Sequence, residues 1–233
     1  MGRPATIGDA YPAGGLVVRA LALQGDPDAM GLPAGETWDL TWRDDGGPDS
    51  VSMAATLTSG CGADLCLGMA WADALRHQGQ AVDILAFPAR LVLRVPGDDG
   101  GLRIVDPCRG GATLSPPALR ALLQESEGPA AALHPGLFDP LDDDEVLLRL
   151  LMEAKVRHLR QGELGQALAM VEGALGLEPG RARLWREAGL MRMRQGDLAG
   201  AVAALEQFVQ RTDNGPARGR ASQLLDQIRV RMR

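Results

Sequence analysis

One segment of the chain occurs twice, and this repetition constrains the fold more than any other feature. Residues Arg160 to Ala167 read RQGELGQA, and the segment returns 34 residues later, from Arg194 to Ala201, as RQGDLAGA. A repeat at this period predicts stacked helical hairpins, because each copy is one unit whose apolar face must be covered by the next. The small residues Ala167 and Ala201 are each followed by larger apolar residues, a pattern that lets antiparallel helices approach closely.

Two further features mark the ends of the repeated unit. Trp185, Ala188 and Gly189 open the second copy with a tryptophan, a small residue and a glycine, and Pro179 closes the first copy. In the period of the repeat, its register and the residues at its ends, the chain resembles the tetratricopeptide (TPR) family from about Leu147 onward. The resemblance implies two repeats and a capping helix, an all-α unit of helical hairpins.

The two parts of the chain carry opposite charge, although the whole has a net charge of −6 over 233 residues. From Met1 to Val146, 9 Arg and no Lys stand against 21 Asp and Glu, which gives −12. From Leu147 to Arg233, 15 Lys and Arg stand against 9 acids, which gives +6. This asymmetry indicates either two modules that attract one another or a basic module with an acidic partner; solvated charged faces are the alternative.

Composition disfavours several functional classes. Three cysteines do not form a disulfide framework, and we expect a reducing, cytoplasmic location. No stretch approaches the ~20 apolar residues of a membrane span. Lysine occurs once and aromatic residues make up 3%, so nucleic-acid binding by the arginine-rich helices is not favoured. Phosphate loops and zinc or metalloprotease motifs are missing, so we expect no cofactor and no metal.

The first residues, 1–47, are predicted to form a Gly/Pro-rich arm. Within it, Leu16 to Leu23 is expected to be a strand or a short helix, and Thr37 to Trp42 alternates like a strand. Trp38 and Trp42 are the candidate anchors by which this arm contacts the domain behind it.

Two helices are predicted after the arm. Pro48 to Gly60 forms a short helix capped by Asp49 or Ser50. Leu65 to Gln78 is apolar around most of its circumference and is therefore expected to be buried. Its clearly solvent-facing positions are few: Asp73, Arg76 and His77.

The remainder of this region predicts a small antiparallel sheet. Three strands are expected, at Ala81 to Phe87, Arg90 to Val95 and Leu102 to Val105. A helix is expected from Ser115 to Gln124, and a loop from Glu125 to Pro140. The acidic run from Asp142 to Glu145 is interpreted as the N-terminal cap of the next helix, because carboxylates favour the helix dipole there, and not as a metal site.

This order of elements, together with the repeats, resembles the bacterial transglutaminase-like family with C-terminal TPRs, whose named member is SirB-one. The likeness rests on residues 48 to 111, namely Pro48, Gly62, the helix end Leu75 to Gly79, Phe87-Pro88, Leu91 to Arg94, Val105 to Pro107, and Gly110-Gly111. It implies an α+β fold: a transglutaminase-like (papain-like) domain at 48–140 with a short antiparallel sheet, followed by the TPR unit at 141–233.

The wider superfamily is equipped for thiol chemistry, with a cysteine at a helix N-terminus, a histidine on a strand and an aspartate on the next strand. By this resemblance, Asp106 fills the aspartate position. The histidine position is filled by Arg90, preceded by Ala89. Arginine cannot act as a base at neutral pH, because its pKa stays above ~12. We therefore expect a degenerate site without catalytic residues.

No cysteine clearly occupies the nucleophile position, which falls near Asp64. Cys61 lies three residues before it and Cys66 two after. His77 follows Cys66 by 11 residues on the same helix, which separates them by ~16 Å along the helix axis. His134 falls in a loop and His158 in a TPR helix. Cys61, Cys66 and Cys108 are accordingly interpreted as small buried apolar residues or incidental thiols.

Arg90 and Asp106 suggest a different role for the site. Their places on neighbouring strands predict a charge pair where the family has its imidazole and carboxylate, and this pair would keep the former site closed. A surface arginine without special function is the alternative.

The register of the repeats also predicts a binding groove. Its residues are taken from the first helix of each hairpin: Arg149, Met152, Val156, Leu159, Arg183, Arg186, Leu190 and Met193. Because much of this surface is apolar, we expect an occupant, either a partner protein or peptide or the chain's own acidic N-terminal domain.

Two functions remain open from the sequence. The first is a non-catalytic interaction or regulatory adaptor. The second is a cysteine-dependent amidase, peptidase or transamidase that uses Cys66 or Cys61 with an unconventional base.

Overall fold

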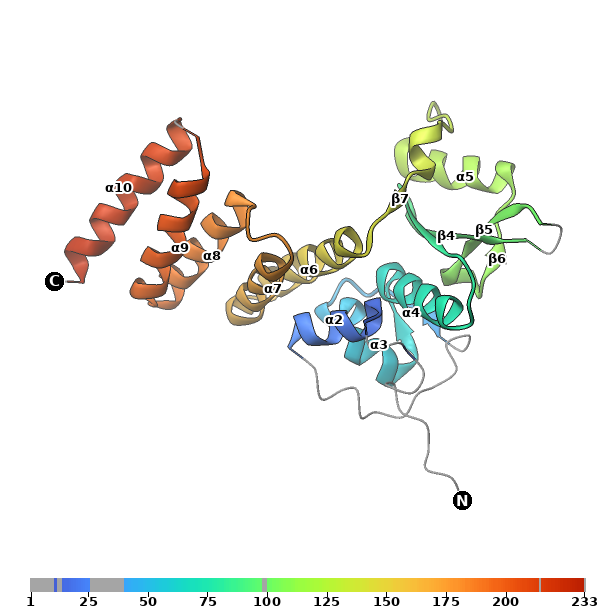
Figure 1. The fold of residues 1–233 in the computed structure, drawn as a ribbon, viewed down its shortest axis with the longest axis horizontal. Helices are drawn as coiled ribbons and strands as arrows, with labels where there is room; N and C mark the ends of the chain where they lie inside the picture. The colour runs from blue at the N-terminus through green and yellow to red at the C-terminus, as the bar shows by residue number, and fades with distance from the viewer. Residues whose placement is uncertain (1–10, 12–13, 26–39, 98–99, 214, 233) are drawn as a thin grey trace, which may run out of the picture. The chain divides into compact units, whose positions relative to one another are not determined.

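The computed structural model describes residues 11, 14–25, 40–97, 100–213 and 215–232 (Figure 1). Its contacts divide the chain into two compact units, Met1–Leu150 and Leu151–Arg233, which are described separately. Within the described ranges no helix combines the length and the apolar run that crossing a membrane would require.

The N-terminal part of the first unit consists of short helices around one long buried helix (Figure 1). These elements are α2 (Leu16–Gln24), the 3-10 turn η3 (Pro48–Val51), α3 (Met53–Ser59) and α4 (Asp64–His77). Between α3 and α4, β2 (Cys61–Gly62) pairs in parallel with β1 (Thr41–Trp42). The short-helix alternative for Leu16 to Leu23 is confirmed.

The expected single helix from Pro48 to Gly60 is wrong. Ser52 interrupts it in an extended conformation, and its side chain accepts a hydrogen bond from Ala55 N at 3.1 Å. A serine in this conformation at a helix start satisfies one of the free amide groups of the first turn. The cap is therefore Ser52, whereas Asp49 lies within η3 and the Ser50 hydroxyl donates to Asp45.

The expectation that Trp38 and Trp42 anchor the arm to the domain is not supported for Trp42. Trp42 lies in β1 and is 51% exposed, so it is not an anchor buried in the domain. Trp38, and the strand expected from residue 37 up to residue 39, lie outside the described residues.

The prediction that α4 is buried is confirmed, but Asp73 was wrongly expected to face solvent. It is 1% exposed, and its Oδ2 accepts a hydrogen bond from Val17 N of α2 at 2.8 Å. The carboxylate thus satisfies a free amide at the start of α2. Burial raises the pKa of Asp73, although hydrogen bonds from the backbone of Val17 and Leu16 and the charge of Arg76 act in the opposite direction.

Five antiparallel strands form the sheet, in the order β6-β5-β4-β3-β7. They are β3 (Asp83–Phe87), β4 (Arg90–Pro96), β5 (Leu102–Asp106), β6 (Ala112–Thr113) and β7 (Pro140–Leu141). The three predicted strands are present as β3, β4 and β5, and β4 pairs with both others. The sequence also predicts a hairpin turn at Asp98 to Gly101 between β4 and β5, but Asp98 and Asp99 lie outside the described residues.

Glu125 to Pro140 was wrongly expected to be loop only. Helix α5 (Pro116–Glu127) extends into it, a 3-10 turn η5 (Pro135–Phe138) follows, and β7 begins at Pro140. Strand β7 pairs with β3 through Ile84 and Leu85. A two-residue strand has no periodicity of its own, so nothing in the local sequence marks it.

The central strand β4 is covered on both faces. Leu91 packs against Gly68 of α4, whereas Val92 belongs to a core cluster with Leu119 and Leu122 of α5. A strand between two layers needs consecutive apolar residues, which explains the run from Leu91 to Leu93. A Cβ at Gly68 would lie 2.2 Å from Leu91 Cδ2, so a larger residue there would force the Leu91 side chain to move.

Helix α6 (Asp143–Arg160) begins with the acidic run, whose predicted role as a cap is confirmed. Asp142 Oδ1 accepts from Glu145 N at 2.8 Å, and Glu145 Oε2 accepts from Asp142 N at 3.0 Å, a reciprocal capping box. Asp143 additionally pairs with Arg76 at 2.9 Å, and Asp144 pairs with Arg19.

The second unit contains the predicted hairpins. Helix α6 is followed by α7 (Leu164–Leu177), then by α8 (Ala182–Gln195) with α9 (Leu198–Arg211), and α10 (Pro216–Arg231) is the last helix (Figure 1). The two copies of the repeated octapeptide form the two helix-to-helix turns. Gly162 and Gly196 occupy equivalent left-handed positions there, with φ of 78° and 84°.

Gly189 lets α8 approach α9 closely. A Cβ at this position would lie 2.8 Å from Leu205 Cγ and 3.3 Å from the Ala201 carbonyl oxygen. Trp185 closes the end of the hairpin, since its Nε1 donates to the Pro179 carbonyl at 2.8 Å. Arg211 stacks over the Trp185 ring, 5.3 Å from its centroid.

The close contact at Gly189 predicts opposite effects for two glycine-to-alanine substitutions. We expect Gly189→Ala to lower the free energy of unfolding by about 1 to 3 kcal/mol, because Leu205 must move. Gly219→Ala in α10, where a Cβ meets nothing within 4 Å, should instead stabilise by up to about 1 kcal/mol. Urea unfolding followed by circular dichroism measures both, and equal effects would contradict the packing described.

The buried carboxylate of Asp73 predicts a difference between two substitutions at that position. Asp73→Ala leaves Val17 N without its acceptor and should cost about 1 to 3 kcal/mol. Asp73→Asn keeps an acceptor oxygen and removes the buried charge, so it should cost less.

The comparison of wild-type protein with Asp73→Asn should also depend on pH. Because the folded-state pKa of Asp73 is raised above its ordinary value of 3.8, the advantage of the wild-type protein is greatest below that pH. It is lost as the pH rises through the folded-state pKa. Unfolding curves between pH 4 and pH 8 measure the trend, and a wild-type advantage that grows with pH would refute this account.

Candidate functional site

The candidate site lies where α4, β4 and β5 meet in the first unit. Asp64, the first residue of α4, accepts a hydrogen bond from Leu91 N of β4 at 2.9 Å through its Oδ2. The carboxylate near the expected nucleophile position therefore joins the helix to the sheet. Arg90 begins β4, and Asp106 ends β5.

Asp106 is fully buried and surrounded by donors. Its Oδ2 lies 3.3 Å from Arg90 Nη1 and 3.7 Å from Arg109 Nε. Its Oδ1 accepts a hydrogen bond from Cys108 N at 2.9 Å, within the 3-10 turn η4 (Pro107–Arg109). The predicted contact between Arg90 and Asp106 is thus present, and the guanidinium neutralises a carboxylate that has no access to solvent.

Cys108 lies beside this pair. Burial raises the pKa of its thiol to about 12, and the negative charges of Asp106 and Asp64 act in the same direction. Because the thiolate is the nucleophilic form of cysteine, this shift disfavours attack by Cys108.

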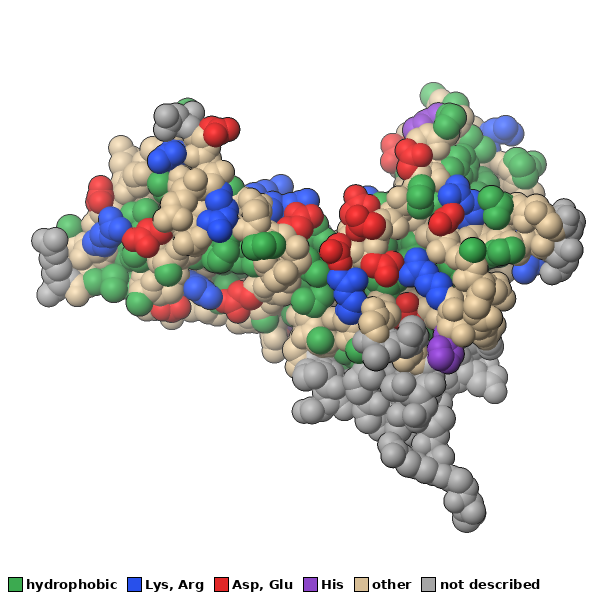
Figure 2. Space-filling model, in the orientation of Figure 1, with side chains coloured by type: hydrophobic (Ala, Val, Ile, Leu, Met, Phe, Trp, Pro, Cys, Tyr) green, Lys and Arg blue, Asp and Glu red, His purple; other side chains and the backbone are tan. Residues whose placement is uncertain are grey.

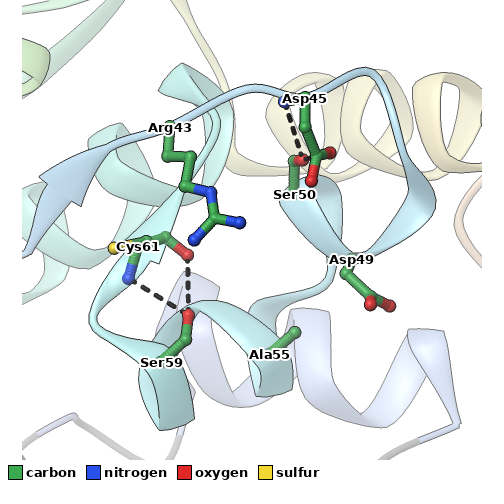
Figure 3. A pocket seen from close by; sticks show the side chains of 7 residues that line it. All are labelled: Arg43, Asp45, Asp49, Ser50, Ala55, Ser59 and Cys61. Carbon is green, nitrogen blue, oxygen red and sulfur yellow. Dashed lines mark hydrogen bonds between the residues drawn. The ribbon is translucent and has the colours of Figure 1, made fainter.

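The two cysteines proposed as alternative nucleophiles are not equivalent. Cys66 is fully buried within α4. Cys61 is half-buried and borders a pocket of about 200 Å³. Its backbone N and O contact the Ser59 hydroxyl, and its sulfur lies on the side turned away from the Arg43 guanidinium (Figure 3).

This pocket was not predicted from the sequence. It forms where β1 pairs with β2, and its remaining lining residues are Asp45, Asp49, Ser50 and Ala55. Hydrogen bonds from Ser50 Oγ and Gly47 N lower the pKa of Asp45. Because segments about twenty residues apart along the chain meet here, no local sequence pattern identifies the pocket.

The three histidines lie on different elements, and none of the contacts described for them involves a cysteine. His77 is exposed at the C-terminal end of α4, whereas Cys66 lies near its N-terminal end. His134 is exposed and precedes η5. His158 Nδ1 lies 2.7 Å from Glu163 Oε2 in the second unit. Across the described ranges, no group of three or more His, Cys, Asp and Glu side chains is arranged to hold a metal ion.

The predicted groove residues of α6 differ in exposure. Arg149 is exposed within the first unit. In the second unit, Met152 is half-buried, and Val156 and Leu159 are 39% and 38% exposed. These three residues leave an apolar strip on α6 accessible.

Helices α6 and α8 are joined by a charge cluster around Glu187. Lys155 Nζ lies 2.8 Å from Glu187 Oε2, and Arg183 Nε lies 2.9 Å from Oε1. Burial alone would raise the pKa of Glu187, but the hydrogen bonds and charges of Lys155 and Arg183 outweigh it and lower that pKa. Arg183, a predicted groove residue, is therefore already paired within the unit.

The remaining predicted groove residues separate into two environments. Met193 packs against the core cluster formed by α9 and α10. Arg186 and Leu190 instead line a pocket of about 100 Å³ between α8, α9 and α10. The other lining residues are Leu205, Ala217, Arg220, Ala221 and Leu224.

Charge on the visible face of the second unit is mixed. Lys and Arg side chains lie among Asp and Glu side chains over α8 to α10, without one continuous basic area (Figure 2). This face therefore does not show the basic stripe that is typical of nucleic-acid-binding proteins (Figure 2).

A buried helix packed on a short antiparallel sheet, followed by paired antiparallel helices, defines a mixed α+β protein with a helical-repeat unit. Residues 41–152 match the model of the transglutaminase-like superfamily, and residues 154–229 match that of the tetratricopeptide repeat. The chain therefore contains a transglutaminase-like domain followed by a TPR unit, and the predicted fold class is confirmed. No curated protein and no solved structure matches it.

The ion pair at Asp106 predicts strong coupling between two substitutions. Arg90→Met should destabilise the protein by about 2 kcal/mol, a value reduced from that of fully buried pairs because the arginine side chain is 22% exposed. In Asp106→Asn the buried charge is absent, so the same Arg90→Met change should cost about 1 to 2 kcal/mol less.

Urea unfolding of the two single variants and the double variant measures this coupling. Arg103→Met is the matched control, because Arg103 is an exposed arginine of β5, and it should change stability by less than about 0.5 kcal/mol. Additive effects of Arg90→Met and Asp106→Asn would show that the contact contributes nothing.

Proposed function

We propose that this protein is a non-catalytic interaction or regulatory adaptor. In this account the transglutaminase-like domain, at 48–140, is a scaffold related to the SirB-one branch of the superfamily, and residues 1–47 are an arm. The TPR unit, at 141–233, recognises a protein partner. None of the three cysteines is part of a disulfide bond, which is consistent with a reducing, cytoplasmic location.

The observation that carries the proposal is the contact between Arg90 and Asp106. A triad requires an imidazole that alternately accepts and donates a proton while the aspartate orients it. Here a guanidinium lies 3.3 Å from the carboxylate, and a guanidinium group is not suited to accept a proton as a base. A site built on this pair has no general base at that position.

The thiols support the same conclusion. Burial and nearby carboxylates raise the pKa of Cys108 to about 12. Cys66 is fully buried, so a peptide amide cannot reach it without rearrangement of α4. Cys61 and Cys108 are both half-buried, and the competing enzymatic function depends on Cys61 or Cys66.

The TPR unit supplies the binding function, because such repeats use exposed faces of stacked helices for protein recognition. Its accessible apolar residues, among them Val156 and Leu159, are suited to a protein surface. The occupant is a partner protein or the chain's own acidic domain.

Two measurements on the full chain test this function. In the first, native protein is alkylated with iodoacetamide at pH 8, with Cys61→Ser as background so that only Cys66 and Cys108 report. We expect labelling to be slower by about 100-fold or more than in urea, because Cys66 is fully buried and burial raises the pKa of Cys108. One rapidly labelled cysteine with an apparent pKa well below ~8.5, in this background or in the wild-type chain, would establish the enzymatic alternative. Amide turnover that is lost in Cys61→Ser or in Cys66→Ser would establish it as well.

In the second measurement, the purified chain captures partners, which are identified by mass spectrometry and then tested by direct binding. The variant Met152→Glu with Leu190→Glu should lose them, because charges replace the apolar groove. Val230→Glu with Leu102→Glu is the matched control, since both residues are exposed apolar residues outside the groove. Circular dichroism must show that both variants are folded. Retention of every partner by the groove variant would remove the TPR groove from the proposal.

A further inference from the structure

The pocket between α8, α9 and α10 has a mainly apolar lining. Leu205 and Ala221 are buried, at 1% and 7% exposure, and Leu190, Ala217 and Leu224 are half-buried around them. The two alanines leave space on the α10 side that larger residues would fill. A volume of about 100 Å³ suits one aliphatic side chain, because an apolar cavity of ~150 Å³ holds a benzene molecule.

Two arginines on the rim of this pocket, Arg186 of α8 and Arg220 of α10, are exposed. In the described part of the chain neither side chain has a hydrogen bond or an ion pair. Most other arginines of the second unit are occupied by acids or carbonyls of the same unit: Arg157, Arg181, Arg183, Arg192, Arg211, Arg218 and Arg229.

None of the seven described residues that line the pocket is acidic. The two rim arginines therefore remain available to an external anion, and they carry part of the +6 charge of residues 147–233. Guanidinium groups prefer carboxylates that they can bind through two parallel hydrogen bonds.

We propose that this pocket binds a segment of a partner protein in which one aliphatic side chain, leucine or a similar residue, is flanked by carboxylates. The aliphatic side chain enters between Leu205 and Ala221, and the carboxylates pair with Arg186 and Arg220. This inference rests on the proposed interaction function and specifies the chemistry of the partner.

A protein segment fits the pocket better than a nucleic acid. Single-stranded nucleic acids bind largely by stacking bases on aromatic side chains, and no aromatic residue is among the seven that line this pocket. A phosphate could pair with the rim arginines but would leave the apolar pocket unfilled. A protein segment that carries both a carboxylate and an aliphatic side chain satisfies both parts of the site.

A displayed library of random peptides, selected on the full-length chain, tests the proposal. We expect enrichment of sequences with an aliphatic residue next to Asp or Glu. An enriched peptide, labelled with fluorescein, then gives a Kd by fluorescence anisotropy, and a labelled 20-nucleotide oligouridine serves as the nucleic-acid probe. Tighter binding of the oligouridine than of the peptide would overturn the assignment.

Variants locate the binding. Arg220→Glu reverses one rim charge and Ala217→Leu fills the pocket, so each should weaken the peptide by at least about tenfold. The matched controls are Arg231→Glu, another unpaired arginine of α10, and Gln223→Leu, an exposed residue of α10 outside the pocket. Both controls should change the Kd by less than about twofold. The peptide with its acids replaced by amides should lose affinity to the same degree as the Arg220→Glu variant.

Failure of this inference differs from failure of the proposed function. Peptides without acidic and aliphatic residues, or a Kd unchanged in Arg220→Glu and Ala217→Leu, would overturn the pocket assignment. Partner capture that depends on Met152 and Leu190 would still support the adaptor in that case. Cysteine-dependent turnover, by contrast, would overturn the adaptor whatever the peptides show.

Discussion

The close contact between α4 and β4 determines the geometry of the first unit. Gly68 allows Leu91 to pack directly on the helix, and the Asp64 carboxylate accepts the amide hydrogen bond of the same leucine. One side-chain contact and one hydrogen bond therefore fix both the distance and the register between helix and strand. Because Arg90 directly precedes Leu91 in β4, the contact at Leu91 also sets the position of Arg90 beside the end of β5.

Burial of Asp106 explains why a cation must stand beside it. An unpaired charge without access to solvent costs several kcal/mol, and removal of one partner from a buried pair is strongly destabilising. Imidazole and guanidinium can both satisfy this requirement for stability, but only imidazole can release its proton near neutral pH. Arg90 therefore meets the requirement of the fold for a cation beside Asp106. Arg109 contributes a second positive charge at 3.7 Å.

The sequence predicted the features that depend on local pattern and period. The repeat identified the TPR hairpins, because Gly162 and Gly196 recur at the same place in each turn. The apolar runs identified α4, β3 and β4. The resemblance to the transglutaminase-like family predicted that Arg90 lies near Asp106, because the histidine and the aspartate of that family lie on neighbouring strands.

Features that depend on distant partners were not predictable. Asp73 looks like a solvent-facing residue of α4, because its partner is an amide of α2, 56 residues away in the sequence. Strand β7 consists of two residues, and its pairing with β3 creates it. Ser52 was overlooked as a cap because Asp49 and Ser50, which precede it, are equally suitable residue types. In each case tertiary structure selected among options that were locally equivalent.

The last helix shows how a short repeat array can be completed and still bind. Two hairpins are fewer than the three or so repeats that usually stabilise such an array, so α9 needs a cover. Helix α10 provides it through Leu225 and Ile228, which join the core cluster with Ala201 and Leu205.

The N-terminal half of α10 covers α9 less completely. It begins with Pro216 and presents alanines and arginines in place of large apolar residues. The pocket is thus left open at the end of the helix where small residues face the array. A capping helix with large apolar residues along its whole length would fill this pocket. The exposed arginines at the rim would then have no apolar pocket beside them for an aliphatic side chain of a ligand.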